Sequence, residues 1–275
     1  MMNESMRMDK IVTVLITGIF LLISLTAGWS EAVELVVENS PYLVTGRLVI
    51  KNGDVLSVEP GVVLEMGRDA EIIIEGRVDI SGYPKGGEVI FKVQGPSGSA
   101  HKGFWKGIVV KSRENNLIKY AIVQHAKTGI TIVSGSSVKI LNNTITQNKI
   151  GVKAEGAQDL SIARNSFLGN FTDIEMKESY GNVKKNYFQG SLTCLKLLES
   201  YPQVEGNYFE QAHKYVMEFN NDSDLAITEN WWGRGDRKRI KDLISLEGKG
   251  KVHFDSFLKE PQQLNEVGVD LAEGL

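Results

Sequence analysis

An asparagine recurs every 21 to 23 residues in the second half of this chain, and this repeat limits the possible folds more than any other feature. The spacings are 22, 21, 21 and 23 residues, and Tyr120 occupies the equivalent slot one repeat earlier. The repeated asparagines are Asn143, Asn165, Asn186, Asn207 and Asn230. Self-similarity at a fixed period of this length is typical of solenoids, in which each repeat forms one coil that stacks on the next.

Apolar residues recur with the same period, in two columns. The first column, two positions after each slot, is Ile122, Ile145, Phe167, Phe188, Phe209 and Trp232, and the second is Ile130, Val152, Ile174, Leu195 and Val216. Short strands of this kind bury an apolar face only when parallel copies stack about 4.8 Å apart. The columns therefore predict continuous internal stacks. The asparagines predict a corner ladder, because an Asn at a bend can tolerate a left-handed backbone conformation and bond neighbouring main chain, and stacked copies can bond one another.

The same architecture is expected to continue upstream with a looser period, because apolar and polar residues alternate there between glycine-containing turns. The residues expected to face inward are Leu48, Ile50, Val55, Leu56, Val58, Val62, Leu64, Ile72, Ile74, Val78 and Ile80. A segment rich in Gly, Pro and Ser at 95–103 predicts an excursion from the wall. Trp105, which follows it, is expected to pack in the core or at its edge.

Residues 1–32 are expected to be a secretory signal peptide. An apolar run from Ile11 to Ala27 follows Arg7 and Lys10, and small residues suited to cleavage follow it. The run is long enough that an uncleaved N-terminal membrane anchor is the alternative. Either arrangement exports the protein, to the periplasm or out of the cell.

The β-helix is expected to span residues 33–260, with a C-terminal cap from about 231. Asp236 predicts the N-cap of a short helix whose apolar face carries Ile240, Leu243 and Ile244. A solenoid must cover its last coil to hide apolar surface and strand edges. Residues 261–275 carry little pattern and are expected to form a loose tail. Cys194, the single cysteine, is expected to pack in the wall.

Several segments resemble right-handed parallel β-helix repeat proteins of the pectin-lyase-like superfamily, in the group called carbohydrate-binding and sugar-hydrolysis domains. They are EPGVVLEM at 59–66, WKGIVV at 105–110, the Asn-containing repeats and NWWG at 230–233. The resemblance covers roughly residues 35 to 258. It implies an all-β, single-stranded right-handed parallel β-helix in an exported prokaryotic envelope protein, often associated with polysaccharide. Many such proteins lack known catalysis, and some assist periplasmic enzymes.

The residues expected to point outward beside the second column are Thr131, Lys153, Glu175, Lys196 and Met217. The alternating charges of Lys153, Glu175 and Lys196 predict a salt-bridge ladder on a solvated wall. Further outward candidates are Glu155, Lys177, Glu178 and Glu199, and Glu175 with Glu155 or Glu178 is the one acid pair that an unusual hydrolase could use. The four histidines are scattered. We therefore predict no catalytic, cofactor-binding or metal-binding residue set and no cofactor.

The sequence favours a non-catalytic exported module that binds an envelope or extracellular partner such as polysaccharide. A net charge of −3 with mixed signs gives no case for nucleic acid, and a membrane contact is expected only if the N-terminal segment is uncleaved. The alternatives are a polysaccharide hydrolase or lyase, and an accessory or assembly module that docks another protein on the 95–105 loop or the cap. Exposed aromatic columns would favour glycan binding, and clustered outward carboxylates would favour an enzyme. Oligomeric state is not determined by the sequence.

Overall fold

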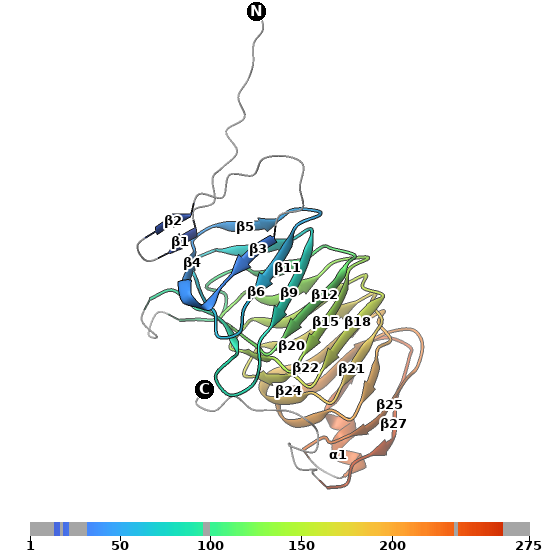
Figure 1. Cartoon of the computed structure of the whole chain (residues 1–275). Helices are drawn as coiled ribbons and strands as arrows, with labels where there is room; N and C mark the ends of the chain where they lie inside the picture. Colours follow the sequence, from blue (N-terminus) through green and yellow to red (C-terminus); the bar gives the residue numbers. More distant parts are fainter. Residues whose placement is uncertain (1–13, 17–18, 22–31, 96–99, 234–235, 261–275) are drawn as a thin grey trace, which may run out of the picture.

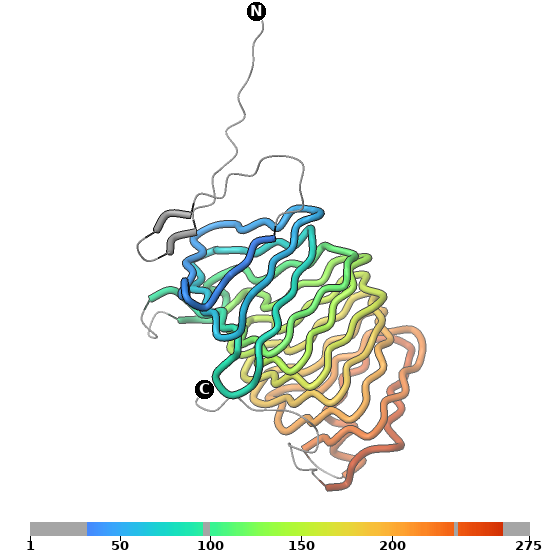
Figure 2. Tube along the Cα trace, in the orientation of Figure 1, coloured from blue at the N-terminus to red at the C-terminus, as the bar shows by residue number. Residues whose placement is uncertain are grey.

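The computed structural model describes residues 14–16, 19–21, 32–95, 100–233 and 236–260, which form a coiled stack of parallel β-strands with one short helix near the C-terminal end (Figure 1). The coil makes about nine turns. Each turn visits three faces, which follow one another in the order 1, 2, 3 along the chain. Figure 2 shows the resulting rungs lying side by side.

The three faces are defined by their strands. Face 1 contains β3 (Ala32–Leu35), β6 (Val55–Val58), β9 (Arg77–Ser81), β12 (Asn115–Lys119), β15 (Ser137–Leu141), β18 (Asp159–Ala163), β21 (Asn182–Lys184), β23 (Gln203–Glu205), β25 (Leu225–Asn230) and β27 (Val252–Phe257). Face 2 contains β4 (Tyr42–Val44), β7 (Val63–Met66), β10 (Val89–Val93), β13 (Ala121–Gln124), β16 (Thr144–Thr146), β19 (Ser166–Leu168) and the first halves of β22 (Tyr187–Leu198) and β24 (Tyr208–Asn220). Face 3 contains β5 (Arg47–Ile50), β8 (Glu71–Ile74), β11 (Gly107–Val110), β14 (Thr128–Ile132), β17 (Ile150–Glu155), β20 (Thr172–Lys177), the second halves of β22 and β24, and β26 (Ile244–Leu246).

The three corners carry the bends between these faces. Corner 1 joins face 1 to face 2, corner 2 joins face 2 to face 3, and corner 3 returns the chain to face 1. Because β22 and β24 pass through corner 2 as continuous strands, hydrogen bonds join faces 2 and 3 into one sheet, whereas face 1 forms a separate ten-stranded sheet. A single 3-10 turn, η1 (Val37–Asn39), lies between β3 and β4.

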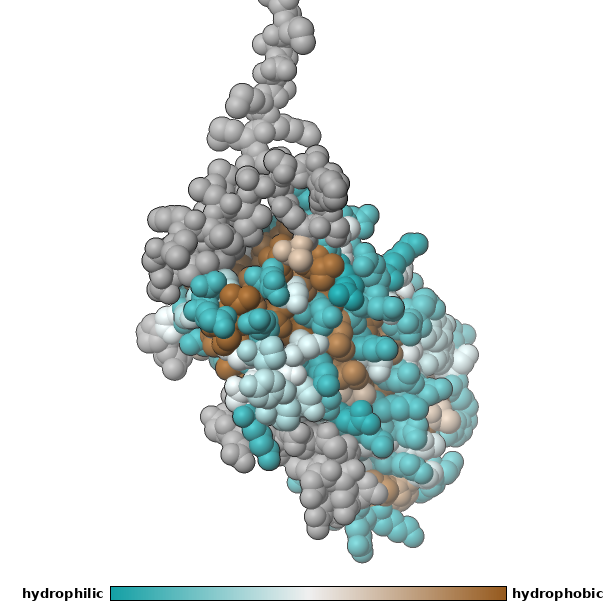
Figure 3. Space-filling model, in the orientation of Figure 1, coloured by the Kyte–Doolittle hydropathy of each residue, from teal (hydrophilic) through white to brown (hydrophobic). Residues whose placement is uncertain are grey.

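The interior of the coil is one continuous apolar core. Of the upstream residues expected inside, all are buried except Val55, which is partly exposed. Trp105 is fully buried, and its indole N–H donates to the carbonyl oxygen of Gln124 (2.8 Å). Phe167, Phe188 and Phe209 stack with ring centroids 5.0 and 4.9 Å apart, close to the spacing between rungs. Outward, face 1 is mostly hydrophilic along its later rungs, with apolar side chains gathered toward the N-terminal end (Figure 3).

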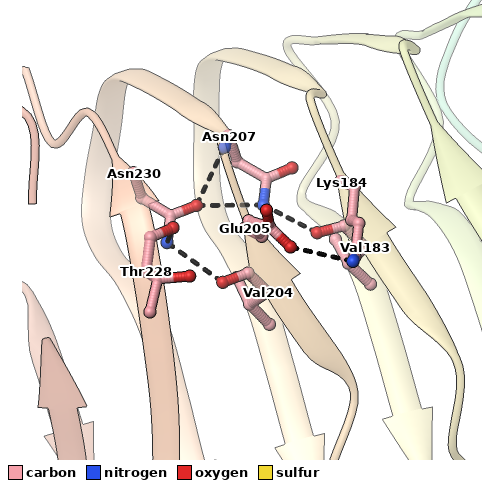
Figure 4. A network of polar contacts seen from close by, with 7 residues as sticks. All are labelled: Val183, Lys184, Val204, Glu205, Asn207, Thr228 and Asn230. Carbon is pink, nitrogen blue, oxygen red and sulfur yellow. Dashed lines mark hydrogen bonds and ion pairs between the residues drawn. The ribbon is translucent and has the colours of Figure 1, made fainter. Parts of the chain in front are cut away.

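The asparagine column forms the expected ladder, at corner 1. Figure 4 shows its last two members: Asn207 donates from Nδ2 to the Val183 carbonyl (2.8 Å) and to Oδ1 of Asn230 (3.0 Å). The backbone N–H of Asn207 donates to the same Asn230 oxygen (2.8 Å). The pattern repeats from Asn143 downward, with every member buried. Each amide thus satisfies backbone groups that the bend removes from the strands.

The asparagines of this ladder do not themselves use the left-handed conformation that they could tolerate. The left-handed conformation belongs to the residue before each Asn, for example Asn142 (φ 53°) and Arg164 (φ 56°). Tyr120 (φ 50°) belongs to that column too, so the predicted slot for Tyr120 was wrong. Ala121 takes the position above Asn143 and donates its N–H to the Asn143 side chain (2.8 Å).

Two predicted columns need correction because a one-residue shift turns a side chain to the other side of a sheet. Val123, and not Ile122, pairs with Ile145 in the inward stack. Met217, and not Val216, pairs with Leu195, because β24 contains one more residue than β22 between the aromatic stack and this point. The outward position assigned to Met217 therefore belongs to Glu218, which pairs with Lys196.

The C-terminal end carries the predicted cap. The carboxylate of Asp236 accepts the N–H of Lys238 (2.9 Å) at the start of α1 (Arg237–Asp242), and Ile240 is fully buried. The carbonyl of Leu243 accepts the N–H groups of Val216 and Met217, which fastens the cap to the last rung of face 3. Residues 261–275, expected to be a loose tail, lie outside the described residues.

At the other end, parts of the predicted signal peptide are described as strands. β1 (Val14–Ile16) and β2 (Ile19–Leu21) pair antiparallel, and β1 lies antiparallel to β4. Cleavage or retention of residues 1–32 stays a prediction. None of the helices in the described ranges is long and apolar enough to cross a membrane.

Candidate functional site

The charged residues singled out on face 3 form an ion-paired wall. Lys153 Nζ lies 2.7 Å from a carboxylate oxygen of Glu155 and 3.5 Å from one of Glu175. The hydrogen bond that the Lys153 ammonium donates to Glu155, ahead of the charge of Glu175, raises the pKa of Lys153. Both carboxylates therefore share one ammonium group, whereas hydrolysis requires one of two carboxyl groups to carry a proton. Lys196 lies beside Glu175 in the parallel register, as predicted.

The other acidic candidates do not join this group. Glu178 and Glu199 lie at corner 3, each with a left-handed backbone (φ 49° and 46°). Glu178 lies 3.7 Å from the ammonium of its neighbour Lys177, and both side chains are exposed. Within the described ranges, no group of three or more His, Cys, Asp or Glu side chains is arranged to hold a metal ion.

A different surface feature is an open groove. The groove of about 560 Å³ lies along corner 2 on the face 2 side, a size within the usual range for ligand sites. Its lining is uncharged and rich in side-chain amides. The lining residues are Gln124, Thr146, Gln147, Leu168, Gly169, Gln189, Gly190 and Gln211.

The repeat itself builds this groove. Gln124, Thr146, Leu168, Gln189 and Gln211 pair with one another in that order on successive rungs, so they form one outward column parallel to the solenoid axis. Neighbouring rungs are about 4.8 Å apart, so the column presents the amides of Gln124, Gln189 and Gln211 along the groove. Between them lie the apolar Leu168 and the buried Thr146, whose hydroxyl donates to the Leu168 carbonyl (2.9 Å). Gly169 and Gly190 leave its floor open at the corner because they add no side chain.

Corner 2 is held by a second ladder that the sequence analysis missed. The left-handed residues Gln147 (φ 55°) and Gly169 (φ 59°) are followed by the buried amides Asn148 and Asn170, whereas His125 (φ 61°) is followed by Ala126. The N–H of Asn148 donates to Oδ1 of Asn170 (2.8 Å), and the Asn170 N–H donates to the Ser191 hydroxyl (3.1 Å). The spacing of 22 residues between Asn148 and Asn170 was visible in the sequence. This shorter ladder holds the backbone beneath the groove.

A buried acid completes the support beneath the groove. Asp173 is fully buried, and its Oδ1 accepts from Ser191 Oγ (2.6 Å) and Asn170 Nδ2 (2.8 Å). Burial raises the pKa of Asp173 to about 7. The Cys194 thiol is also fully buried, and burial, followed by the charge of Asp173, raises its pKa well above the usual value. Both side chains therefore pack inside the wall, as expected for Cys194, and neither is accessible to solvent.

Aromatic side chains flank the groove without forming an open platform. Tyr187, Tyr208 and Trp231 stack on the outer side of face 2, with Leu168 and Leu258 packed against them. Tyr187 and Tyr208 are only 6 and 8% exposed, and burial raises the pKa of Tyr187 to about 12. Leu168 packs against these rings and also lines the groove, so the aromatic cluster supports one side of the groove.

The glutamines were missed although their spacing carries a signal. Gln124, Gln147, Gln189 and Gln211 are separated by 23, 42 and 22 residues, which are one or two repeat lengths. In the sequence, these polar residues could not be distinguished from other polar residues expected at the surface. What distinguishes them is that they line one groove, and the groove exists only because the rungs stack.

Comparison with known proteins agrees with this geometry. Residues 99–232 match the family described as the right-handed beta helix region. No curated protein and no solved structure matches the chain. The matched repeats and the three-faced parallel coil are consistent with the pectin-lyase-like superfamily that the sequence resembles. Residues 99–232 belong to the right-handed beta helix region family, and the described residues as a whole fold as a parallel β-solenoid.

Proposed function

We propose that this protein is an exported, non-catalytic module that binds an extended polysaccharide along corner 2. The observation that carries the proposal is the amide-lined groove, which runs parallel to the solenoid axis across five rungs. Sugar hydroxyls donate and accept hydrogen bonds, and each Gln amide offers both kinds of partner. A polymer lying along the groove can therefore contact amides on several rungs at once.

Two further features support binding rather than catalysis. The groove lining contains no carboxylate, histidine, lysine or arginine, so it lacks groups suited to general acid–base chemistry. The acids of face 3 lie on a different wall and share Lys153 between them. The predicted signal peptide supports export, which places such a groove where polysaccharides occur.

The test measures binding and turnover in the same samples. The purified exported protein is incubated with a panel of neutral and acidic polysaccharides, and bound fraction, new reducing ends and absorbance of unsaturated products are recorded. We expect binding without products. Products that disappear in a Glu175→Gln variant would show instead that the protein is an enzyme acting through face 3.

A matched pair of variants locates the binding site. Gln189→Ala/Gln211→Ala removes two amides from the groove, and Gln158→Ala/Gln203→Ala removes two exposed amides elsewhere. Each lost neutral hydrogen bond costs about 0.5–1.5 kcal/mol, so we expect the groove variant to bind roughly tenfold more weakly and the control to bind like the wild type. Equal affinities for the two variants would exclude the groove as the site.

A further inference from the structure

Three lysines occupy equivalent positions on successive rungs beside the groove. Lys106, Lys127 and Lys149 are exposed, and each directly follows the residue that turns inward at corner 2. The N–H of Lys127 donates to the Trp105 carbonyl (2.7 Å), and the N–H of Lys149 donates to the Ala126 carbonyl (3.0 Å). These bonds align the three lysines in a row, which we name the lysine row, on the face 3 side of corner 2.

The charges of the lysine row are not paired with carboxylates of the described residues. Throughout the described residues, no carboxylate lies within ion-pair distance of any of its three ammonium groups. By contrast, Lys153 on the adjacent wall has carboxylates of Glu155 and Glu175 beside it. Like charges stacked on neighbouring strands repel one another. A row of this kind is therefore suited to an anion supplied from outside the protein.

The segment at 100–104 adds positive charge at the same corner. Lys102 Nζ lies 4.5 Å from the centre of the Phe171 ring. Lys149 lies against Gly103, because a side chain at that glycine would meet the Lys149 chain at 2.5 Å. Burial lowers the pKa of His125, and the positive charges of His101 and Lys102 lower it further.

Asp173 neutralises little of the positive charge at corner 2. The charge of Asp173 acts on Lys102, but the carboxyl group is fully buried and its pKa is raised to about 7. The ammonium groups of the lysine row face solvent, whereas Asp173 lies under the corner. Along the lysine row itself, the exposed charges are therefore all positive.

We propose that corner 2 selects a polysaccharide that carries negative charges. The groove amides hold sugar hydroxyls, and Lys127 and Lys149 pair with the anionic groups at rung spacing. This inference rests on the proposed function and adds the chemical class of its ligand. A glycan fits better than single-stranded nucleic acid, which requires a series of exposed aromatic platforms. At this corner the exposed ring of Phe171 already has Lys102 above it.

The test compares dextran with its sulfated form, which shares the same backbone, and adds polygalacturonate and single-stranded DNA. The two acidic polysaccharides are expected to bind about tenfold more tightly than dextran at low salt, with the difference shrinking at high salt because screening weakens exposed charge pairs. Lys127→Gln/Lys149→Gln should reduce that preference to about threefold or less. The control Lys139→Gln/Lys249→Gln makes the same change in net charge at exposed lysines elsewhere and should keep it.

The outcomes separate this inference from the proposed function. If dextran binds in the groove as tightly as the acidic polysaccharides, or if the Lys127/Lys149 variant leaves their preference unchanged, selection by the lysine row is wrong and the glycan groove stands. If DNA binds as tightly as the acidic polysaccharides, the lysine row attracts any polyanion and the inference fails. If none of the polysaccharides binds, both proposals fail.

Discussion

Removing one amide from the middle of the corner 1 ladder tests how this solenoid is held together. In Asn165→Ala, the Asn143 backbone N–H and the Ile140 carbonyl lose side-chain partners at 2.9 Å each. The Asn143 amide also loses its bond to Asn165 (3.0 Å) but keeps its bond to Ile118, and Asn186 keeps an N–H donor from residue 165. The position is fully buried, so water does not replace the missing partners.

The expected loss of stability follows from the number of hydrogen bonds that Asn165→Ala removes. Two backbone groups are left without the partners that Asn165 supplied, and each such buried group costs about 1–3 kcal/mol. We therefore expect the free energy of unfolding to fall by about 2–6 kcal/mol, with a small further loss from the space that the amide vacates.

Urea unfolding followed by circular dichroism measures the change, with Asn115→Ala as the control because Asn115 is an exposed residue of β12. Hydrogen exchange of the Asn143 and Ile140 regions shows whether the loss is local, as expected when each rung contacts only its neighbours. A loss below about 0.5 kcal/mol, or one equal to that of Asn115→Ala, would refute the reasoning that the ladder supplies essential hydrogen bonds.

The remaining predictions concern corner 2. Gly107 has φ 122°, and a Cβ there would lie 1.6 Å from the Thr128 carbonyl oxygen. Gly107→Ala should therefore lower the free energy of unfolding by more than about 4 kcal/mol or prevent folding. The control Gly46→Ala has open space around its Cβ and should be nearly neutral in the same urea assay. Because the raised pKa of Asp173 keeps the folded carboxyl protonated while the unfolded one ionises, its contribution to stability is present below about pH 4 and is lost as the pH rises to about 7. The unfolding free energy of the wild type relative to Asp173→Asn should therefore decline by up to about 4 kcal/mol over that range, and parallel pH profiles for the two proteins would contradict this assignment. The groove and lysine-row variants described above give two further tests, read as polysaccharide affinity.

The sequence predicted the charged wall of face 3, on which the enzyme hypothesis rests, but it did not predict the groove. The interleaving of Lys153 and Glu175 was predicted from the period alone, and the ion pair at 3.5 Å confirms it. The groove required knowledge of which residues share an outward column. Gln189 and Gln211 align only because the parallel register absorbs the irregularity between β22 and β24. No local pattern encodes that irregularity, because it arises where two neighbouring rungs differ in length.

By itself, the sequence determined the solenoid, its inward columns, the corner 1 ladder and the capped C-terminal end. These features follow from periodicity and local chemistry: parallel strands repeat their alternation, asparagine amides satisfy bends, and Asp236 caps the helix it precedes. Only the tertiary structure decided which residue bends at each corner, where the register shifts, and that glutamines and lysines from separate rungs lie along one corner. The physical reason is that a one-residue slip reverses a side chain's direction, and stacking between rungs, which lie more than 20 residues apart in the chain, selects the register.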